Sequence, residues 1–479
     1  MKSSPNFFKA MLATLLLAVT FSCSDDDNGD QIPIEQEQNI VEIALGTPEL
    51  SILVAALSAA DGNLVDLLGT DGPFTVLAPT NAAFTAFLAS NGFASLEDVP
   101  TDVLAEILLN HVISADITSG DLAAAGAGYA STNASGAGGN NISIYFNTSN
   151  GVRFNNVSAV TDGGADIDAS NGTIHIVDAV IPIPSILTHA AANADFSSLV
   201  VALGAADGDL IDVLAGDGPF TVLAPDNAAF TTFLDGADLG GVNTAVLSQI
   251  LLNHVLGGVV TSSDLVAGGA GYTNTSATGP GENALSLYYN TSDGVVFNGI
   301  STVTAADVVG TNGIIHAVDT VIDIPTVVTF AAADPNFTTL VEALTTLTPG
   351  TDFVSILSRT EGSNADGINP EFTVFAPTND AFAELAEIPG EVVLTQVLLH
   401  HVVSEANITS GDLTPDGDTT APTLEGDDIT ITLPGTDPNI ADVTDGAGNT
   451  GKGIIAVDVQ AGNGVIHVLD AVLIPDTTN

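Results

Sequence analysis

The stretch FTVLAPTNAAF at Phe74–Phe84 decides the fold, and it recurs as FTVLAPDNAAF at Phe220–Phe230 and FTVFAPTNDAF at Phe372–Phe382. In each copy a β-branched run predicts a strand, and the proline that follows ends it because proline has no N–H for a sheet ladder. The next residue predicts a helix N-cap, and apolar residues behind it recur at helical spacing. The copies start 146 and 152 residues apart, far more than one solenoid repeat. The stretch therefore predicts three tandem domains, each with its own core.

Residues at the turns between these strands and helices are predicted to be structural, as caps or turn residues. They are Thr80, Asn81, Asp226, Asn227, Thr378 and Asn379. A side-chain oxygen at an N-cap accepts one of the N–H groups that the first helical turn leaves unpaired.

The composition limits the possible partners. Five Lys and Arg stand against 58 Asp and Glu in 479 residues, for a formal net charge of −53. Nucleic acids and anionic lipid surfaces bind through clustered cations, so this charge argues against both. It is compatible with a cationic partner, with divalent ions, or with solvation in salty water, where repulsion is screened. Trp is absent and Tyr numbers five, which disfavours a lectin that stacks sugar rings on aromatic side chains.

The N-terminus, residues 1–22, has the three parts of a secretory signal: two lysines, the apolar run Ala10–Phe21, and the small residue Ser22. Cys23 is the one cysteine of the chain, so no intrachain disulfide can form. A small residue before a lone cysteine resembles a bacterial lipobox, which implies that Cys23 is lipidated and begins the mature chain. An ordinary cleaved signal is the alternative.

Residues 23–38 form a polar, acidic linker with too little apolar surface to fold. The acidic cluster directly behind Cys23 resembles the surface-export tag of lipoproteins in the Bacteroidetes. That resemblance implies an exported outer membrane lipoprotein at the cell surface, which touches the membrane only through its N-terminal lipid. A spacer with no address value is the alternative. No second apolar run of about 20 residues follows, so no further membrane-spanning helix is predicted.

Three predicted domains follow the linker, at residues 39–184, 185–325 and 326–476. Each has two opening helices, the strand–turn–helix stretch, a helix that ends in histidine, a hairpin and a closing strand. In the first domain the closing strand is predicted over Gly172–Ile181, and the Gly-, Ala- and Asn-rich stretch 123–141 is predicted to be a loop. The prolines at the two domain boundaries leave almost no linker, which predicts semi-rigid junctions.

The third domain diverges from the other two. Its stretch Thr345–Glu371 is longer than the counterparts, and its hairpin region Leu413–Gly453 lacks the GAGY run found at Gly126–Tyr129 and near Gly269–Tyr272. We therefore expect a ligand shared between domains to bind the first two.

The run FTVLAPTNAAF, the helix end LLNHV and the strand GTIHIVDAVI recur with small changes, in the same order, in all three domains. In that order they resemble the first motif, the tyrosine–histidine region and the second motif of the fasciclin domain. The resemblance covers about Asn39–Asp476. It implies an α+β fold, a small β-sandwich-like wedge flanked by helices, and a cell-surface or secreted adhesion module without catalysis.

The chain departs from the family at the middle motif. The family pairs tyrosine with histidine there, in animal members linked to integrin binding, whereas this chain has Asn or His in place of the tyrosine, and it contains no Arg-Gly-Asp. The departure argues against integrin as the partner. The candidate binding residues at this motif are Asn110, His111, Asn253, His254, His400 and His401.

Six of the eight histidines occupy equivalent places, three at the helix end and three on the closing strand. The strand histidines are His175, His316 and His467. One interpretation makes each pair a zinc site or an acid–base couple. The interpretation we favour is a core role, with ring nitrogens satisfied by backbone or by the Asn of the turn, because both the helix face and the strand face are apolar.

Three aspartates lie among apolar residues of the closing strand and are predicted to be buried structural anchors, paired or hydrogen-bonded. They are Asp178, Asp319 and Asp470. Calcium is a further hypothesis, because Asp162–Gly172 and Asp207–Asp209 place carboxylates in glycine loops. Neither loop completes the EF-hand pattern, and we expect no resident cofactor or metal.

No sequence motif for catalysis is present: there is no G-x-S-x-G, no H-E-x-x-H, no phosphate-binding G-x-x-x-x-G-K and no cysteine pair. We therefore expect no enzyme. Three near-copies of one module suit multivalent adhesion to matrix, to a cell-surface polymer or to like cells, and self-association is a further alternative. The alternative is a glycan-capturing surface lipoprotein of a polysaccharide-uptake system.

Overall fold

The computed structural model describes residues 37–476, so the signal, Cys23 and nearly all of the linker lie outside the described residues. Within them the hydrophobic core is divided into six clusters, two for each domain. The three domains therefore pack separately, as the spacing of the copies predicts, and meet only at their junctions.

Domain 1 has six helices: α1 (Ile40–Gly46), α2 (Ser51–Ala59), α3 (Leu64–Leu68), α4 (Asn81–Ser90), α5 (Thr101–Leu109) and α6 (Ser119–Ala125). Its strands are β1 (Phe74–Pro79), β2 (Val112–Ile113), β3 (Ala127–Ser135), β4 (Asn141–Asn147), β5 (Arg153–Phe154), β6 (Ser158–Ala159), β7 (Ile167–Ala169) and β8 (Gly172–Val177).

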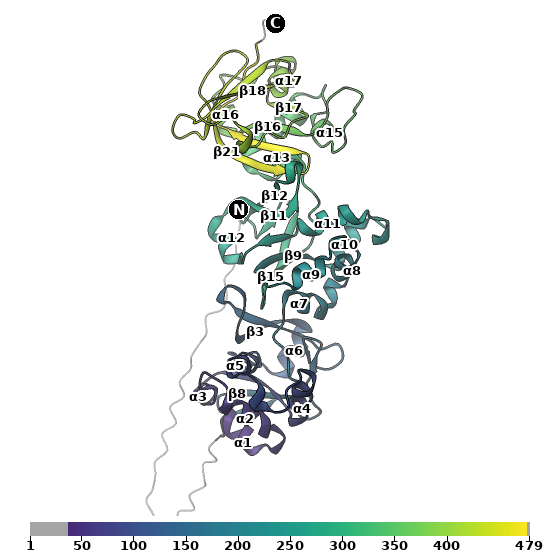
Figure 1. Ribbon diagram of the computed structural model, residues 1–479, viewed down its shortest axis with the longest axis vertical. Helices are drawn as coiled ribbons and strands as arrows, with labels where there is room; N and C mark the ends of the chain where they lie inside the picture. Colours follow the sequence, from purple (N-terminus) through teal and green to yellow (C-terminus); the bar gives the residue numbers. More distant parts are fainter. Residues whose placement is uncertain (1–36, 477–479) are drawn as a thin grey trace, which may run out of the picture. The chain divides into compact units, whose positions relative to one another are not determined.

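Domain 2 repeats this order. Its helices are α7 (Ile186–Ala192), α8 (Ser197–Ala205), α9 (Leu210–Ala215), α10 (Asn227–Leu234), α11 (Thr244–Leu252) and α12 (Ser262–Gly268). Its strands are β9 (Phe220–Pro225), β10 (Val255–Gly257), β11 (Ala270–Thr278), β12 (Ala284–Asn290), β13 (Val296–Phe297), β14 (Ser301–Gly310) and β15 (Gly313–Val318). Helices α8–α11 gather on one side of the strands (Figure 1).

Domain 3 keeps the same core elements with a different hairpin region. Its helices are α13 (Val327–Ala333), α14 (Thr338–Glu342), a π-helix (Ala343–Leu347), α15 (Phe353–Leu357), α16 (Asn379–Ala383) and α17 (Glu391–His400). Its strands are β16 (Phe372–Pro377), β17 (Val402–Ser404), β18 (Asp418–Pro422), β19 (Asp428–Thr432), β20 (Ala441–Thr444), β21 (Lys452–Ala461) and β22 (Gly464–Leu469).

The centre of each sheet is a parallel pair formed by the FTV strand and the closing strand. In domain 1 the strand order is β6-β5-β4-β3-β2-β1-β8-β7, and β1 pairs with β8 in the register Leu77 opposite His175. Domain 2 closes the same arrangement into a barrel, and domain 3 has seven strands in one sheet. The chain therefore has the predicted α+β fold, with helices on one face of each sheet and a β-hairpin layer on the other.

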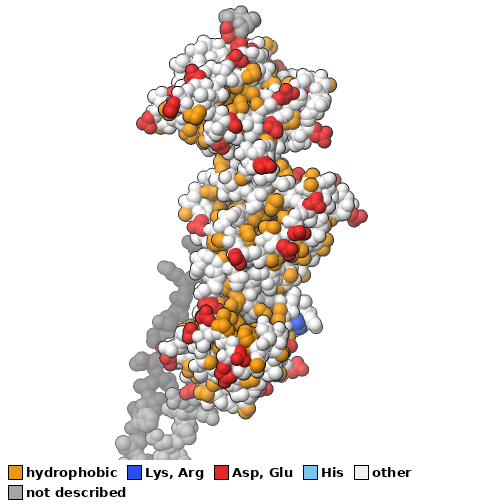
Figure 2. All heavy atoms as spheres, viewed as in Figure 1, with side chains coloured by type: hydrophobic (Ala, Val, Ile, Leu, Met, Phe, Trp, Pro, Cys, Tyr) orange, Lys and Arg blue, Asp and Glu red, His pale blue; other side chains and the backbone are white. Residues whose placement is uncertain are grey.

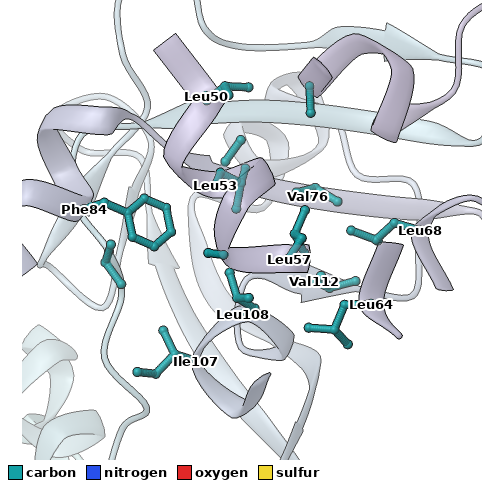
Figure 3. Close-up of a cluster of buried hydrophobic side chains, with 14 of the residues drawn as sticks. Leu50, Leu53, Leu57, Leu64, Leu68, Val76, Phe84, Ile107, Leu108 and Val112 are labelled. Carbon is teal, nitrogen blue, oxygen red and sulfur yellow. The ribbon is translucent and has the colours of Figure 1, made fainter. Parts of the chain in front are cut away.

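The FTV strand is buried on both faces, which explains its unbroken apolar run. Phe74 and Val76 pack into the helical cluster, whereas Leu77 packs into the hairpin cluster. Labelled side chains from the helices and from β1 point toward one another in the helical cluster (Figure 3). Gly172 is the first residue of β8, at φ +143, where a Cβ would lie 1.8 Å from the Phe74 carbonyl oxygen. The tight parallel pairing therefore requires glycine at the start of the closing strand.

The structure corrects three sequence predictions. Stretch 123–141 is not a loop, because it contains the end of α6 and strand β3, which pairs with β4 despite its weak intrinsic propensity. The helix predicted to reach the histidine ends at Leu109, and the closing strand ends at Val177 instead of Ile181. The predicted hairpin itself is confirmed, as β4 paired with β5.

Among the described residues no single helix is long and apolar enough to cross a membrane. Two pairs of consecutive helices are together long and apolar enough, by length and composition alone, but the pairs are bent by 103° and 99° between their helices.

Phe84 tests how far domain 1 depends on its helical cluster. Its side chain is 1% exposed, so Phe84→Ala should lower the free energy of unfolding of domain 1 by about 3–5 kcal/mol. Urea unfolding followed by circular dichroism and domain-resolved hydrogen exchange would measure the loss. Phe87→Ala, on the same helix and only partly buried, is the matched control and should cost clearly less; equal losses would contradict the assignment.

Candidate functional site

The three helix-end histidines are buried and bridge two backbone segments. His111 Nδ1 lies 2.7 Å from the Ile107 carbonyl oxygen, and the Ile181 N–H donates to Nε2 at 2.9 Å. The ring is therefore the Nδ1–H tautomer, since Nε2 must accept. His254 and His401 repeat the arrangement, with Ile322 and Leu473 as the N–H donors.

Burial sets the protonation state of these rings. Loss of solvation lowers the pKa of His111, His254 and His401 to about 4, and the backbone hydrogen bond opposes it only in part. The rings are neutral at neutral pH. Because both nitrogens are engaged with backbone groups, neither is available to a zinc ion or to a substrate proton.

The closing-strand histidines form a second set of bridges. His175 Nε2 donates to the Ile117 carbonyl at 2.9 Å, and Nδ1 accepts the Asp166 N–H at 3.2 Å. His316 makes the equivalent contacts with the Val260 carbonyl and the Asp307 N–H. His467 keeps the carbonyl contact, to Ile408 at 2.8 Å. The Asn of the turn contacts none of these rings, which corrects that part of the sequence interpretation.

A serine and an aspartate accompany each strand histidine. Asp166 accepts hydrogen bonds from both the hydroxyl and the N–H of Ser119, and its carboxylate lies 3.9 Å from His175 Nδ1. In a hydrolase triad the imidazole stands between serine and carboxylate and takes the serine proton. Here the serine binds the carboxylate directly and the imidazole receives a backbone N–H. The order of contacts therefore does not activate a nucleophile.

The candidate binding residues of the middle motif lie away from solvent. Asn110, His111, Asn253, His254, His400 and His401 are 0–3% exposed. Asn110 Nδ2 donates to the Ile181 and Pro182 carbonyls, and Asn253 donates to the equivalent pair in domain 2. A partner protein cannot contact buried side chains. These residues instead cross-link segments of their own domain.

His400 replaces that asparagine in domain 3 and lies beside Glu425 and Asp427. Their ligand atoms lie within 4.8 Å of one another, the one such group of three among the described residues. Yet His400 Nε2 accepts the Gly446 N–H at 2.9 Å, and Nδ1 lies 3.2 Å from Thr423 Oγ1 and 3.7 Å from Glu425. Burial lowers the pKa of His400, and the neighbouring carboxylates oppose this. Both ring nitrogens already have partners, so the geometry favours a cross-link over a metal site.

The three closing-strand aspartates do not lie where the sequence predicts. Asp178 and Asp319 are exposed and Asp470 is partly buried, because each follows the end of its strand. Each still accepts one backbone N–H, from Ala159, Thr302 and Gly453 at 2.7–2.8 Å. They anchor a neighbouring segment, but the premise that they are buried in the strand is wrong.

The predicted cap residues do cap their helices, whereas the asparagine that follows each of them has a different role. Thr80, Asp226 and Thr378 each cap the following helix by accepting an N–H three residues on. Asn81 instead ties the turn to the opening helices: Oδ1 accepts the Ile52 N–H and Nδ2 donates to the Pro48 carbonyl. Asn227 and Asn379 make the same pair of contacts.

Sequence reasoning missed a second asparagine anchor. Asn171 Oδ1 accepts the Ile40 N–H, and Nδ2 donates to the Leu68 and Thr70 carbonyls. Asn312 and Asn463 repeat the pattern. The Asn-Gly pair at the start of every closing strand was the available signal.

The two acidic glycine loops do not gather carboxylates into a group of three within the described part of the chain. Asp166 is engaged with Ser119, and Asp207 accepts the Thr244 hydroxyl. Calcium remains a proposal for experiment.

The GAGY tyrosine joins each of the first two domains to the next. Tyr129, on β3, packs against the core of domain 2, with its ring centroid 5.2 Å from Tyr145 and 5.6 Å from His189. Asn193 Nδ2 donates to the Tyr129 hydroxyl at 3.3 Å. Tyr272 repeats this at the second junction.

At that second junction the ring of Tyr272 lies 5.1 Å from Tyr288 and 5.7 Å from Phe330, and its hydroxyl donates to Asp334 at 3.0 Å. A serine on the paired strand completes each junction by accepting an N–H from the next domain, Ser143 from Val309 and Ser286 from Gln460. Domain 3 has no GAGY and no following domain among the described residues. The run therefore marks a domain junction, and the expectation that a shared ligand binds the first two domains stays a prediction.

Comparison with known proteins places these features in a family. The fasciclin domain matches residues 48–184, 194–325 and 335–475. Protein sll1483 of Synechocystis sp. is 39% identical over 160 residues, 32% of this chain and 78% of that protein. Human periostin is 28% identical over 55% of this chain and 29% of its own length. Rabbit transforming growth factor-beta-induced protein ig-h3 is 27% identical over 91% of this chain and 57% of its own length.

A solved structure of a FAS1 domain pair from the insect cell adhesion molecule fasciclin I is 20% identical, with a TM-score of 0.38, and covers 59% of this chain and 97% of that one. The chain thus spans little more than half of ig-h3 and less than a third of periostin.

The helix-end histidines predict a pH dependence of stability. Their folded pKa of about 4 lies below the ordinary 6.5, so the unfolded chain binds protons first and stability falls as pH drops from 6.5 toward 4. Between pH 7 and 5 the expected loss is about 2 kcal/mol per histidine. Urea unfolding at pH 7, 6 and 5 measures it before most carboxylates titrate. His111→Gln should flatten the slope for domain 1 alone; a slope of zero in the unaltered chain would contradict the assignment.

The contacts of Tyr129 predict that this one side chain couples domain 1 to domain 2. Tyr129→Ala should speed amide exchange in α7 of domain 2 by about tenfold or more, since the ring packs on that helix and an aromatic contact contributes ~1 kcal/mol beyond its buried area. Hydrogen exchange with mass spectrometry reads this directly. Tyr289→Ala removes an equal side chain inside domain 2 and serves as control. Unchanged exchange in α7 would contradict the docking role.

Proposed function

We propose that this chain, which belongs to the fasciclin domain family, is an adhesion protein displayed on a bacterial cell surface by a lipid on Cys23. The observation that carries the proposal is the threefold repetition of one family domain, joined through two equivalent tyrosine junctions. Relatives in this family act in adhesion at cell surfaces and in matrix. Repetition suits that role, because linked weak sites can bind 10²–10⁴-fold more tightly than one site.

The chemistry of the recurrent residues agrees with a binding role. The histidines, asparagines and Ser–Asp pairs that recur in each domain are engaged in bridges to backbone. The proposal therefore assigns them no catalytic step. The partner we propose is matrix, a surface polymer or another cell, and its contact surface must be built from other, exposed residues.

The proposal also specifies how the protein is anchored to the membrane. Ser22-Cys23 and the acidic run behind it support an exported outer membrane lipoprotein that faces outward. Calcium stays within the proposal as a possible aid to binding, to be tested by adding and chelating it.

Deletion of the gene should abolish surface attachment or aggregation of the cells, and the unaltered gene should restore it. Cys23→Ala should release the protein from the membrane fraction and fail to restore attachment, whereas Ser24→Ala, its matched control, should behave as wild type. Attachment assays, fractionation and protease treatment of whole cells provide the readouts, each with and without calcium. Attachment that survives deletion would count against adhesion, and micromolar binding of one polysaccharide would favour glycan capture.

A further inference from the structure

Each domain exposes a valine at the same place on the helix that ends in histidine. Val103 on α5 is 44% exposed, Val246 on α11 is 50% exposed and Val393 on α17 is 43% exposed. The next residue in each helix is leucine, at most 1% exposed. The core therefore takes the leucine and leaves the valine in water. Valine is also a weaker helix former than Lys, Arg, Glu or Gln, so neither burial in the core nor helix propensity favours valine at this position.

The exposed valine of domain 1 borders a hollow between α3 and α5. The hollow has a volume of about 760 Å³, and Leu67, Val103, Leu109 and Ile183 belong to its apolar lining. The first three come from the two helices, and Ile183 comes from the segment that leads to domain 2. A volume of this size suits a ligand or a short segment of a partner.

The same helix pair carries apolar side chains in the other domains. Seven of the fifteen exposed large hydrophobic residues in the described part of the chain lie on α3, α5 or their counterparts. These seven are Val103, Ile211, Val213, Val246, Val354, Val392 and Val393. We call the exposed apolar side chains on this helix pair the valine face of each domain; in domain 1 it consists of Val103 and Leu67 at the hollow. Figure 2 shows hydrophobic side chains at the surface of all three domains, with acidic side chains between them.

Charge around the hollow limits what can occupy it. Asp61, Asp102 and Glu106 belong to its lining, and no Lys or Arg does. A second copy of this chain, with a net charge of −53, would be repelled, and so would an anionic membrane. An occupant needs an aliphatic face to fill the hollow and cations beside that face to meet the carboxylates.

We propose that the valine face docks the apolar side of a basic amphipathic helix on a partner protein. A helix presents aliphatic residues at i, i+3 and i+4 along one side, which matches a hollow between two helices. Lysines or arginines that flank this side pair with Asp61 and Asp102. The inference rests on the proposed adhesion function and names the chemistry of its partner.

The test uses the full chain and a fluorescent 18-residue peptide with leucine on one helical face and lysine on the other. Two control peptides replace every leucine by serine or every lysine by glutamate. Fluorescence anisotropy should show micromolar binding of the leucine–lysine peptide, and binding of both controls should be at least about tenfold weaker, because the first lacks the apolar anchor and the second is repelled.

Variants locate the binding site. The triple variant Val103→Ser, Val246→Ser, Val393→Ser should weaken the leucine–lysine peptide by about tenfold, the amount expected for one buried valine at each site. The matched triple is Leu45→Ser, Val266→Ser and Ile440→Ser. It removes one exposed hydrophobic residue per domain outside the valine face, at 65%, 61% and 41% exposure, and should bind as wild type. Circular dichroism checks that both triples are folded.

Two results would overturn the inference: equal loss of binding in both triples, or binding of the serine–lysine peptide as tight as that of the leucine–lysine peptide. The first would reduce the interaction to nonspecific apolar contact, and the second to nonspecific charge attraction. Expressing the triples in the deletion strain separates the two proposals. If cells with the Val103 triple still attach, adhesion stands and the valine face is not its contact surface. If attachment never depended on the gene, the adhesion function itself fails.

Discussion

The parallel pairing of the FTV strand with the closing strand leaves buried N–H and C=O groups in the segments around them, and imidazole rings satisfy these groups. His175 bridges the Ile117 carbonyl and the Asp166 N–H, and His111 bridges the Ile107 carbonyl and the Ile181 N–H. An unsatisfied buried group costs about 1–3 kcal/mol. A neutral imidazole offers one donor and one acceptor on opposite sides of a rigid ring, which no other side chain does in that volume. The histidines therefore recur because the backbone around the parallel pair requires them.

Tyrosine has the corresponding role between domains. Its ring packs into the core of the next domain, and its hydroxyl bonds the polar residue that directly follows the first helix of that domain, Asn193 or Asp334. The aromatic partner in the next domain differs, His189 at one junction and Phe330 at the other, but both contacts are T-shaped. Among the described residues no domain follows domain 3; its hairpin region lacks the GAGY run, and His400 at the end of α17 stands where the other two domains have asparagine.

The sequence predicts most of the fold because its strongest signals are local. The Pro79 stop, the Thr80 cap and the apolar run of β1 depend only on neighbouring residues, and all three are present in the structure. Strand β3 could not be predicted, because its Gly- and Ala-rich sequence becomes a strand only through pairing with β4. The exposure of Asp178 could not be predicted either, since it depends on where the ladder ends.

The candidate site was harder to predict than the fold for a related reason. Recurrence identifies residues that every copy needs, and what every copy needs first is a stable interior, so the recurrent histidines are buried. The proposed binding surface is under a weaker constraint, so its equivalent positions keep an aliphatic side chain but not the same residue. Leu67, Val213 and Ile356 occupy one such helical position in the three domains.

At physiological salt the Debye length is about 8 Å, so the total charge of the chain gives little specificity beyond that range. Specificity must come from the few carboxylates beside an apolar contact, with the charges steering the encounter and the buried aliphatic groups slowing dissociation. Under the proposed adhesion function, contacts on separate domains strengthen each other only if the separations between them are held, and the tyrosine junctions are contacts that join neighbouring domains.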